Sequence, residues 1–167
     1  INVNIFKCNN MNLKKIRLDQ SGISDAIFFR QKTNIFDKRI ITHLKNHYKK
    51  NKTELRYCLH KDKSNNMQVM INLIIRKKKY QIHFHNYSDE YYFPIVGSLK
   101  ILTFCKQGTF VSSNEIDKKN NFLGKVFKKQ THIAIPVKKF CIYLEFRSGN
   151  FTNHKNIFLK KFLNYNE

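Results

Sequence analysis

Short runs of apolar residues, rich in Val, Ile, Phe and Tyr, follow one another at intervals of about ten residues from position 67 onward. Turn-forming or charged clusters separate them, for example at residues 76–79, 86–89 and 118–121. Short strands at this spacing are typical of antiparallel β-sandwiches and β-barrels. We therefore expect an all-β fold whose strands cover Met67–Ile75, Tyr80–His85, Tyr91–Val96, Leu99–Cys105, Phe122–Phe127, His132–Ile135 and Phe140–Phe146.

Less regular segments flank this β-rich region. Between Asn34 and Lys50 the apolar residues recur with helical spacing, so we expect a helix there, capped by Asn34. The segment Asn156–Tyr165 is predicted to form a short amphipathic C-terminal helix. The sequence thus predicts three parts: an N-terminal arm (1–33) with one strand near residues 26–29 that packs on the barrel, a main domain with its leading helix (34–151), and a C-terminal tail or helix (152–167).

Size and cysteine usage narrow the class of protein. A chain of 167 residues, 41% of them hydrophobic, can bury a core within one domain. No apolar run approaches the roughly 18 residues of a membrane-spanning helix, so we expect no membrane span. The four cysteines are widely spaced and form no Cys-x-x-Cys pair, which excludes a zinc ribbon and predicts free thiols in a cytoplasmic protein.

The net charge of +21 can be interpreted in two ways. A strongly basic chain suggests a polyanionic partner such as nucleic acid. Lysine supplies most of the charge, however, and heavy use of Lys, Asn and Ile is also what an AT-rich genome produces. The lysine clusters stand between the apolar runs, where solvated turns are predicted. We favour solvated turns, and we do not expect a nucleic-acid partner.

Two histidines stand one residue apart in a single predicted strand. Because side chains alternate along a strand, His83 and His85 share one face. A short turn then lets Glu90 on the next strand reach the same point, and Gly97 permits the following tight turn. Nitrogen and carboxylate ligands suit a divalent transition metal such as iron, manganese, nickel or zinc, whereas magnesium and calcium prefer all-oxygen sites.

This string resembles the first motif of the cupins, His-x-His, four residues, Glu, six residues, Gly. One element departs, since Lys77 stands where that motif usually has a glycine. Cupins also have a second motif that supplies a third histidine. Its usual form can be placed on Pro136, which puts Cys141 at the ligand position, and the other candidate is His132.

Three further stretches bear on this choice: Arg56-Tyr-Cys-Leu59-His60, the methionine-bearing strand Met67-Gln-Val-Met70-Ile71, and the run from His132 through Glu145 and Gly149 to Phe151. In these stretches the chain resembles the WbuC-type cupins, small metalloproteins found among polysaccharide and O-antigen gene products. This narrower resemblance favours His132 as the third histidine. The departures from that family, Thr131, Asn150, Ile82 and the absence of tryptophan, indicate a divergent member.

The resemblance implies a small cupin-type antiparallel β-barrel, or jelly roll, with a helix before it. It also implies that one divalent transition metal is held by His83, His85, Glu90 and His132. Arg56 is expected to clamp a phosphate or carboxylate, and His60 to shuttle a proton.

Three more residues complete the expected site. Glu145 is predicted to act as a general base or to orient a ligand histidine. Tyr80 and Gln81 are expected to line the substrate pocket.

Three functions remain open from the sequence. The first is a metal-dependent cupin acting on a nucleotide sugar or sugar derivative in surface-polysaccharide (O-antigen or lipopolysaccharide) biosynthesis, with isomerase- or epimerase-like chemistry. The second is a non-catalytic module that binds a carbohydrate or anion. The third, a nucleic-acid-binding barrel, would make the metal motif a coincidence. Because cupins often pair through sheet edges, we also expect a homodimer.

Overall fold

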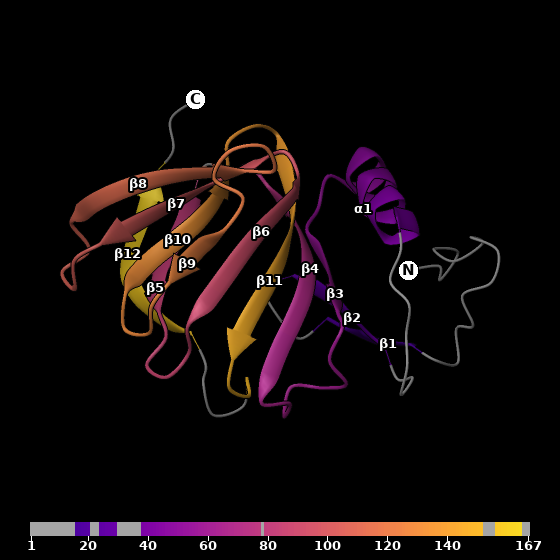
Figure 1. The fold of residues 1–167 in the computed structure, drawn as a ribbon, viewed down its shortest axis with the longest axis horizontal. Coiled ribbons are helices and arrows are strands. Elements are labelled where there is room, and N and C mark those ends of the chain that lie inside the picture. The colour runs from indigo at the N-terminus through magenta and orange to yellow at the C-terminus, as the bar shows by residue number, and fades with distance from the viewer. Residues whose placement is uncertain (1–15, 21–23, 30–37, 78, 152–155, 165–167) are drawn as a thin grey trace.

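Two β-sheets pack face to face in the computed structural model, which describes residues 16–20, 24–29, 38–77, 79–151 and 156–164 (Figure 1). The seven-stranded sheet has the order β1 (Ile16–Asp19), β2 (Asp25–Phe29), β3 (Leu55–Cys58), β4 (Met67–Ile75), β11 (Phe140–Ser148), β6 (Glu90–Val96) and β9 (Gly124–Val126). The five-stranded sheet has the order β12 (Ile157–Asn164), β5 (Lys79–Phe84), β10 (Thr131–Pro136), β7 (Ser98–Phe104) and β8 (Phe110–Asp117).

The predicted all-β class is confirmed, and each predicted strand corresponds to an observed one. β4 has the predicted bounds, whereas β9 is shorter than the apolar run that contains it. β8 was not predicted, because it is an edge strand with most of its side chains exposed on both faces. Such a strand lacks the apolar alternation by which half-buried strands are recognised.

The prediction of a C-terminal helix is wrong, because residues 157–164 form strand β12, antiparallel to β5. The apolar residues at 157–159 and 162–163 fit either structure, and short apolar runs do not separate helix from strand by periodicity. Pairing decides the outcome, since β12 satisfies the backbone groups along the free edge of β5.

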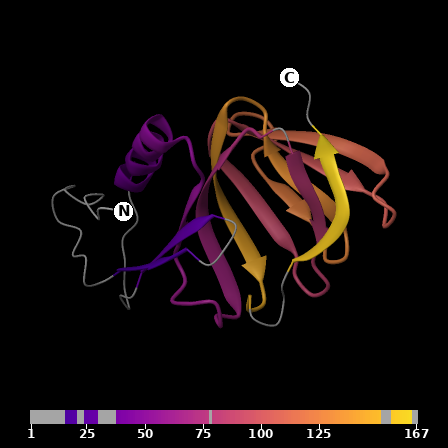
Figure 2. The ribbon, with the colours of Figure 1, turned by 180° about the vertical axis from the view of Figure 1, so that it is seen from behind.

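The predicted leading helix is present as α1 (Lys38–Asn51), while the predicted cap, Asn34, lies outside the described residues. α1 packs against the seven-stranded sheet, on the face that points away from the second sheet (Figures 1 and 2). Ile40 and Leu44 are fully buried there against Tyr57, Leu73 and Ile142. None of the described helices is long and apolar enough to cross a membrane.

The N-terminal arm contributes two strands rather than the one predicted. β1 and β2 form an antiparallel pair, and β2 then pairs in parallel with β3. This parallel pair joins the arm to the seven-stranded sheet. Parallel neighbours need a crossover connection, and the chain between β2 and β3, which contains α1, provides it.

Gly97 forms the turn between β6 and β7 with φ of +79°, in the left-handed region that the motif predicts for a tight turn. A Cβ atom at this position would lie 3.0 Å from the carbonyl oxygen of Phe140. We expect Gly97→Ala to lower the free energy of unfolding by about 1–2 kcal/mol, measured by urea denaturation. Gly97→Asn adds the same Cβ but tolerates positive φ better, so it should cost less. Equal stability of Gly97→Ala and the wild type would contradict this account.

The space between the sheets changes from apolar to polar along β11. Cys141 and Tyr143 face inward and pack with Leu99 and Ile101 of the opposite sheet. The next two residues on the same face, Glu145 and Arg147, line a cavity instead. The apolar end holds the sheets together, and the polar end leaves room for a site.

Candidate metal centre

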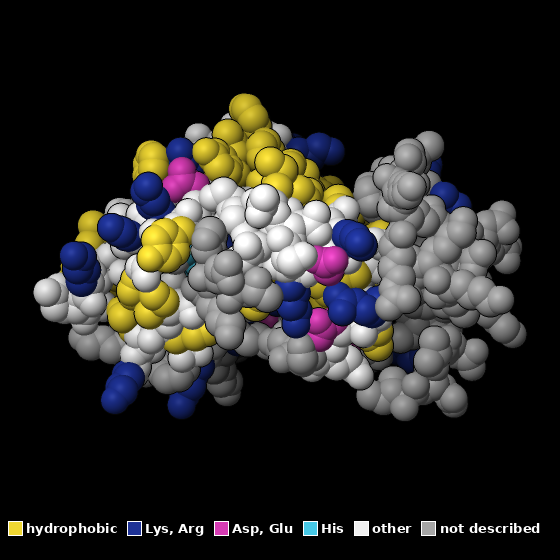
Figure 3. Space-filling model, turned by 90° about the horizontal axis from the view of Figure 1, so that it is seen from below, with side chains coloured by type: hydrophobic (Ala, Val, Ile, Leu, Met, Phe, Trp, Pro, Cys, Tyr) yellow, Lys and Arg dark blue, Asp and Glu magenta, His cyan; other side chains and the backbone are white. Residues whose placement is uncertain are grey.

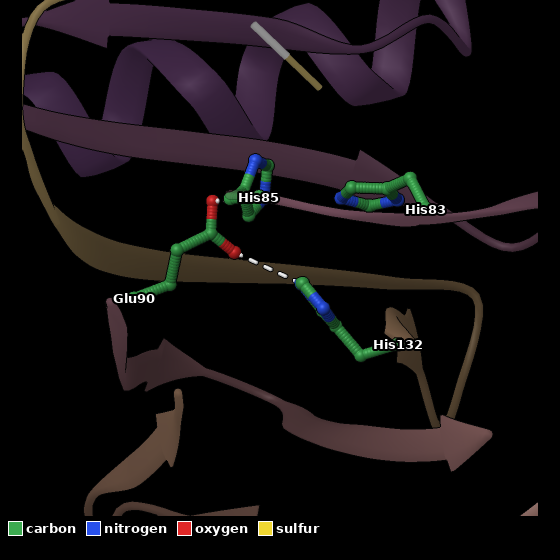
Figure 4. A group of neighbouring side chains, drawn as sticks. All are labelled: His83, His85, Glu90 and His132. Carbon is green, nitrogen blue, oxygen red and sulfur yellow. Dashed lines mark hydrogen bonds and ion pairs between the residues drawn. The ribbon is translucent and has the colours of Figure 1, made fainter. Parts of the chain in front are cut away.

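Four side chains converge at the polar end of the sandwich (Figure 4). His83 lies on β5, His85 directly follows that strand, Glu90 begins β6 and His132 lies on β10. One nitrogen or oxygen atom from each residue lies within 4.8 Å of the corresponding atoms of the other three. The geometry therefore matches a single site for one ion.

Strand pairing explains why these residues meet. His83 and His132 face each other directly across the antiparallel pair β5–β10, so their side chains project from the same face. The turn after His85 carries the chain to the opposite sheet, where Glu90 points back toward the histidines. The structure brings together all four residues that the cupin resemblance implies as ligands.

The competing ligand, Cys141, lies elsewhere. Its side chain is fully buried in the apolar cluster with Leu99 and Tyr143, and burial raises the pKa of its thiol to about 12. A thiol that resists ionisation is a poor metal ligand. Cys58, Cys105 and Cys141 are free, as expected for the cysteines that the structure describes.

The carboxylate of Glu90 lies between two of the histidines. Its Oε1 atom is 2.8 Å from Nε2 of His85, and its Oε2 atom is 3.0 Å from Nε2 of His132. The Nδ1 atom of His132 is 2.8 Å from the carbonyl oxygen of Gln130, to which it donates. A histidine anchored in this way through one ring nitrogen presents the other in a fixed direction, as metal-binding histidines do.

The hydrogen-bond partners of the histidine ring nitrogens indicate whether an ion fits this site. Both nitrogens of His85 are buried. Nδ1 has no hydrogen-bond partner among the described residues, and Nε2 lies 2.8 Å from Oε1 of Glu90 without the geometry of a hydrogen bond. The hydrogen bond that the structure records for His83 is a long one, 3.4 Å from Nδ1 to the carbonyl oxygen of Gln81. Buried polar atoms without partners are costly, and a cation between the three imidazoles would supply the missing partner. The residues present therefore fit a divalent metal.

Burial and the Glu90 charge set the protonation states. Burial, together with the neighbouring His132, lowers the pKa of His83 to about 3, and burial also lowers the pKa of His85 despite Glu90. Burial would lower the pKa of His132 too, but its contact with Glu90 outweighs burial and raises it. Burial would raise the pKa of Glu90, but contacts with His132 and His85 hold it well below its ordinary value. Uncharged imidazoles and an ionised carboxylate are the forms that bind metals.

A cavity of about 600 Å³ adjoins the cluster, with His83 and Glu90 in its wall. Figure 3 looks onto this end of the molecule, where mixed Lys, Arg, Asp and Glu side chains lie right of centre and hydrophobic ones lie to the left and above. The cavity is rich in groups that form hydrogen bonds. Its polar lining includes Arg56, Gln68, Asn72, Glu145, Arg147 and Asn156.

Arg56 and Glu145, predicted as catalytic residues, both line this cavity. Nε and Nη2 of Arg56 donate to Oγ of Ser24 at 2.9 and 2.6 Å, which fixes the guanidinium at the cavity wall. Nδ2 of Asn72 donates to Oε2 of Glu145 at 2.7 Å. Burial, reinforced by the charge of Glu90, raises the pKa of Glu145 to about 7. A carboxyl group that titrates near neutrality is suited to proton transfer.

His60 lies in a different place, beside a neighbouring cavity of about 100 Å³ that Arg56 also lines. Its Nδ1 atom is 3.1 Å from the backbone nitrogen of Val69, and its ring meets the ring of Phe28 edge-on with centroids 5.5 Å apart. Burial lowers the pKa of His60. The structure does not bring His60 to the four clustered residues.

The two predicted pocket residues do not line the large cavity either. The phenol oxygen of Tyr80 accepts a hydrogen bond of 2.7 Å from the backbone of Lys77, and the ring packs on Ile82. Gln81 shares the strand face of His83 but is exposed. Tyr80 and Gln81 lie on the same strand as His83, but this position does not bring either residue to the cavity.

Sequence reasoning missed most of the polar residues of the cavity, among them Tyr92, Asn72 and Arg147. Tyr92 and Arg147 each stand two residues beyond a predicted site residue, Glu90 and Glu145 respectively. Alternation along a strand puts such pairs on one face, so this signal could have found both. No comparable signal marks Asn72.

The model of a domain of unknown function, DUF6016, matches residues 36–116, and no curated protein matches the sequence. Among solved structures, the capsular polysaccharide assembling protein CapF from Staphylococcus aureus matches 58% of this chain and 27% of its own, with TM-score 0.50 and 13% identity. CapF with the inhibitor 3-isopropenyl-tropolone matches 65% of this chain and 32% of its own, with TM-score 0.52 and 12% identity. This chain thus spans about a third or less of those proteins. At such identities the likeness shows the fold alone, and that fold is the cupin jelly roll.

Proposed function

We propose that this protein is a metal-binding cupin in which His83, His85, Glu90 and His132 hold one divalent transition metal. The observation that carries the proposal is the convergence of three imidazoles and one carboxylate, with donor atoms within 4.8 Å of one another. Burial keeps His83 and His85 uncharged, which leaves their lone pairs available. Such a donor set suits iron, manganese, nickel or zinc.

The cavity residues provide the rest of a reaction site. A bound ion would supply a Lewis acid that polarises a carbonyl group of the substrate. Glu145 faces the same cavity with a pKa near neutrality, so it can take a proton from a carbon next to that carbonyl and return it. Arg56 can bind an anionic substituent through the guanidinium N–H groups that Ser24 does not occupy.

The proposed substrate is a nucleotide sugar or sugar derivative, and the proposed reaction is an isomerisation or epimerisation in surface-polysaccharide biosynthesis. The size of the cavity and its many hydrogen-bonding groups support a polar substrate of this kind. CapF, a protein of similar fold, is named for capsular polysaccharide assembly. The resemblance to WbuC-type cupins supports the same substrate class.

Solvent-exchange kinetics test this reaction. We expect the metal-loaded protein to transfer deuterium from D2O to a carbon-bound position of its sugar substrate, followed by NMR over a panel of nucleotide sugars. Because the base must be ionised, the rate should rise with pH up to about 7 and then level off. Glu145→Gln should lower the rate by roughly 100-fold or more.

The matched control is Glu115→Gln, which changes an exposed carboxyl group on β8 and should leave the rate unchanged. A Glu145→Gln protein with the rate and pH profile of the wild type would contradict the assigned role of Glu145. Saturable sugar binding without deuterium exchange would favour the second candidate function, a non-catalytic carbohydrate- or anion-binding module.

A further inference from the structure

Tyr92 contacts two residues of the candidate metal site, Glu90 and His132, but is not a defined position of either motif. It stands two residues beyond Glu90 on β6, so both side chains point inward from the same face. Its side chain is only 3% exposed. The phenol donates a hydrogen bond to Oε2 of Glu90, and its oxygen lies 3.3 Å from Nε2 of His132. The hydroxyl group therefore contacts two of the four clustered residues, Glu90 and His132, at the carboxylate oxygen and the ring nitrogen that face each other.

The two oxygens of Glu90 have different surroundings. Oε1 lies 2.8 Å from Nε2 of His85 and 3.8 Å from Nε of Arg147. Oε2 lies 3.0 Å from Nε2 of His132 and accepts the hydrogen bond from Tyr92. A glutamate side chain can rotate about three bonds, and these contacts select one orientation. Tyr92 holds the oxygen that faces His132.

The ring of Tyr92 is fixed by packing against apolar neighbours, in addition to the hydrogen bond of its hydroxyl group. It packs in the apolar cluster with Leu99 and Ile101, and its centroid is 5.7 Å from that of Tyr143. Close-packed side chains keep their rotamers. The packed ring therefore fixes the position of the hydroxyl group relative to Glu90. A preorganised metal site needs supporting residues that are fixed in this way.

We propose that Tyr92 is a positioning residue of the metal centre, whose phenol hydrogen-bonds Glu90 and keeps its carboxylate in the orientation in which the four ligands converge. The inference rests on the proposed metal-binding function. Tyr92 acts as a neutral donor and is not itself a ligand. Hydrogen-bonding partners of metal ligands typically contribute about 10- to 100-fold to metal affinity.

The test is Tyr92→Phe, which removes the hydroxyl and keeps the packed ring. Affinities for Zn(II) and Mn(II) are measured by competition with a chromophoric chelator, and the Mn(II) site is examined by electron paramagnetic resonance. We expect Tyr92→Phe to bind both metals about 10- to 100-fold more weakly and to change the zero-field splitting of bound Mn(II). The change in splitting reports on the ligand arrangement and would not follow from a loss of stability alone.

Tyr143→Phe is the matched control, because it removes a buried phenol from the adjoining ring and leaves the contacts of Glu90 intact. It should keep the affinity and the spectrum of the wild type.

Wild-type protein that binds no metal would overturn the proposed function. Wild-type protein that binds metal, together with a Tyr92→Phe protein of equal affinity and spectrum, would overturn only the role of Tyr92. Equal losses in both variants would also overturn it. Tyr92→Met retains apolar volume and serves the same comparison if Tyr92→Phe does not fold.

Discussion

Replacing His132 by alanine is expected to remove tight metal binding. The side chain is fully buried, and its Nε2 atom lies 3.0 Å from Glu90. Loss of a residue that merely supports a ligand costs about 10- to 100-fold in affinity, so loss of one of three imidazoles should cost at least about 100-fold. The affinity is measured by equilibrium dialysis against Zn(II) or Mn(II).

Two further variants make this result interpretable. His83→Ala should lower the metal affinity as much as His132→Ala does, with less effect on folding. Among the described residues, the histidines paired with Glu90 are His85 and His132, and His83 is not one of them. Cys141→Ala changes the competing residue of the second motif and should retain the metal. Retention of metal by His132→Ala together with its loss in Cys141→Ala would reverse the ligand assignment.

Replacing Leu44 by alanine is expected to destabilise the protein by about 2–5 kcal/mol, as in other fully buried leucines. Leu44 is 0% exposed and packs from α1 onto Leu55, Tyr57 and Leu73 of the seven-stranded sheet. Truncation would leave a cavity between helix and sheet that the rigid strands cannot fill. Urea denaturation of the metal-free protein measures the change.

Lys45 provides the control on the same helix, since it is exposed. Lys45→Ala should change the free energy of unfolding by no more than about 0.5 kcal/mol. An unchanged stability of Leu44→Ala would mean that α1 is not part of the folded core.

Periodicity was a sufficient guide for the longer strands that bury one face or both, although it missed the short buried strand β3. β4 and β11 carry nearly continuous apolar runs, and their bounds follow closely from the sequence. It failed for β8, whose residues are solvent-exposed, and for β12, whose type depends on the free edge of β5. Pairing between distant segments is a tertiary effect that local patterns do not contain.

The candidate site likewise divides into residues placed by local sequence relations and residues placed by contacts between distant segments. His83, His85 and Glu90 could be placed together because a strand, a short turn and a strand fix their relation locally. His132 lies more than forty residues away from Glu90 in sequence, and only the family resemblance selected it over Cys141. The predicted pocket residues Tyr80 and Gln81 lie on the strand of His83 but do not line the cavity. Most of the cavity wall instead comes from the facing sheet, through residues such as Asn72 and Arg147.

The most direct test of the central claim is the metal content of the wild-type protein, measured by mass spectrometry after purification without a metal-affinity tag. The convergence of His83, His85, Glu90 and His132 predicts about one equivalent of a divalent transition metal per chain. Protein that carries no such metal, and that takes up none when iron, manganese, nickel or zinc is added, would contradict the assignment of this cluster as a metal centre.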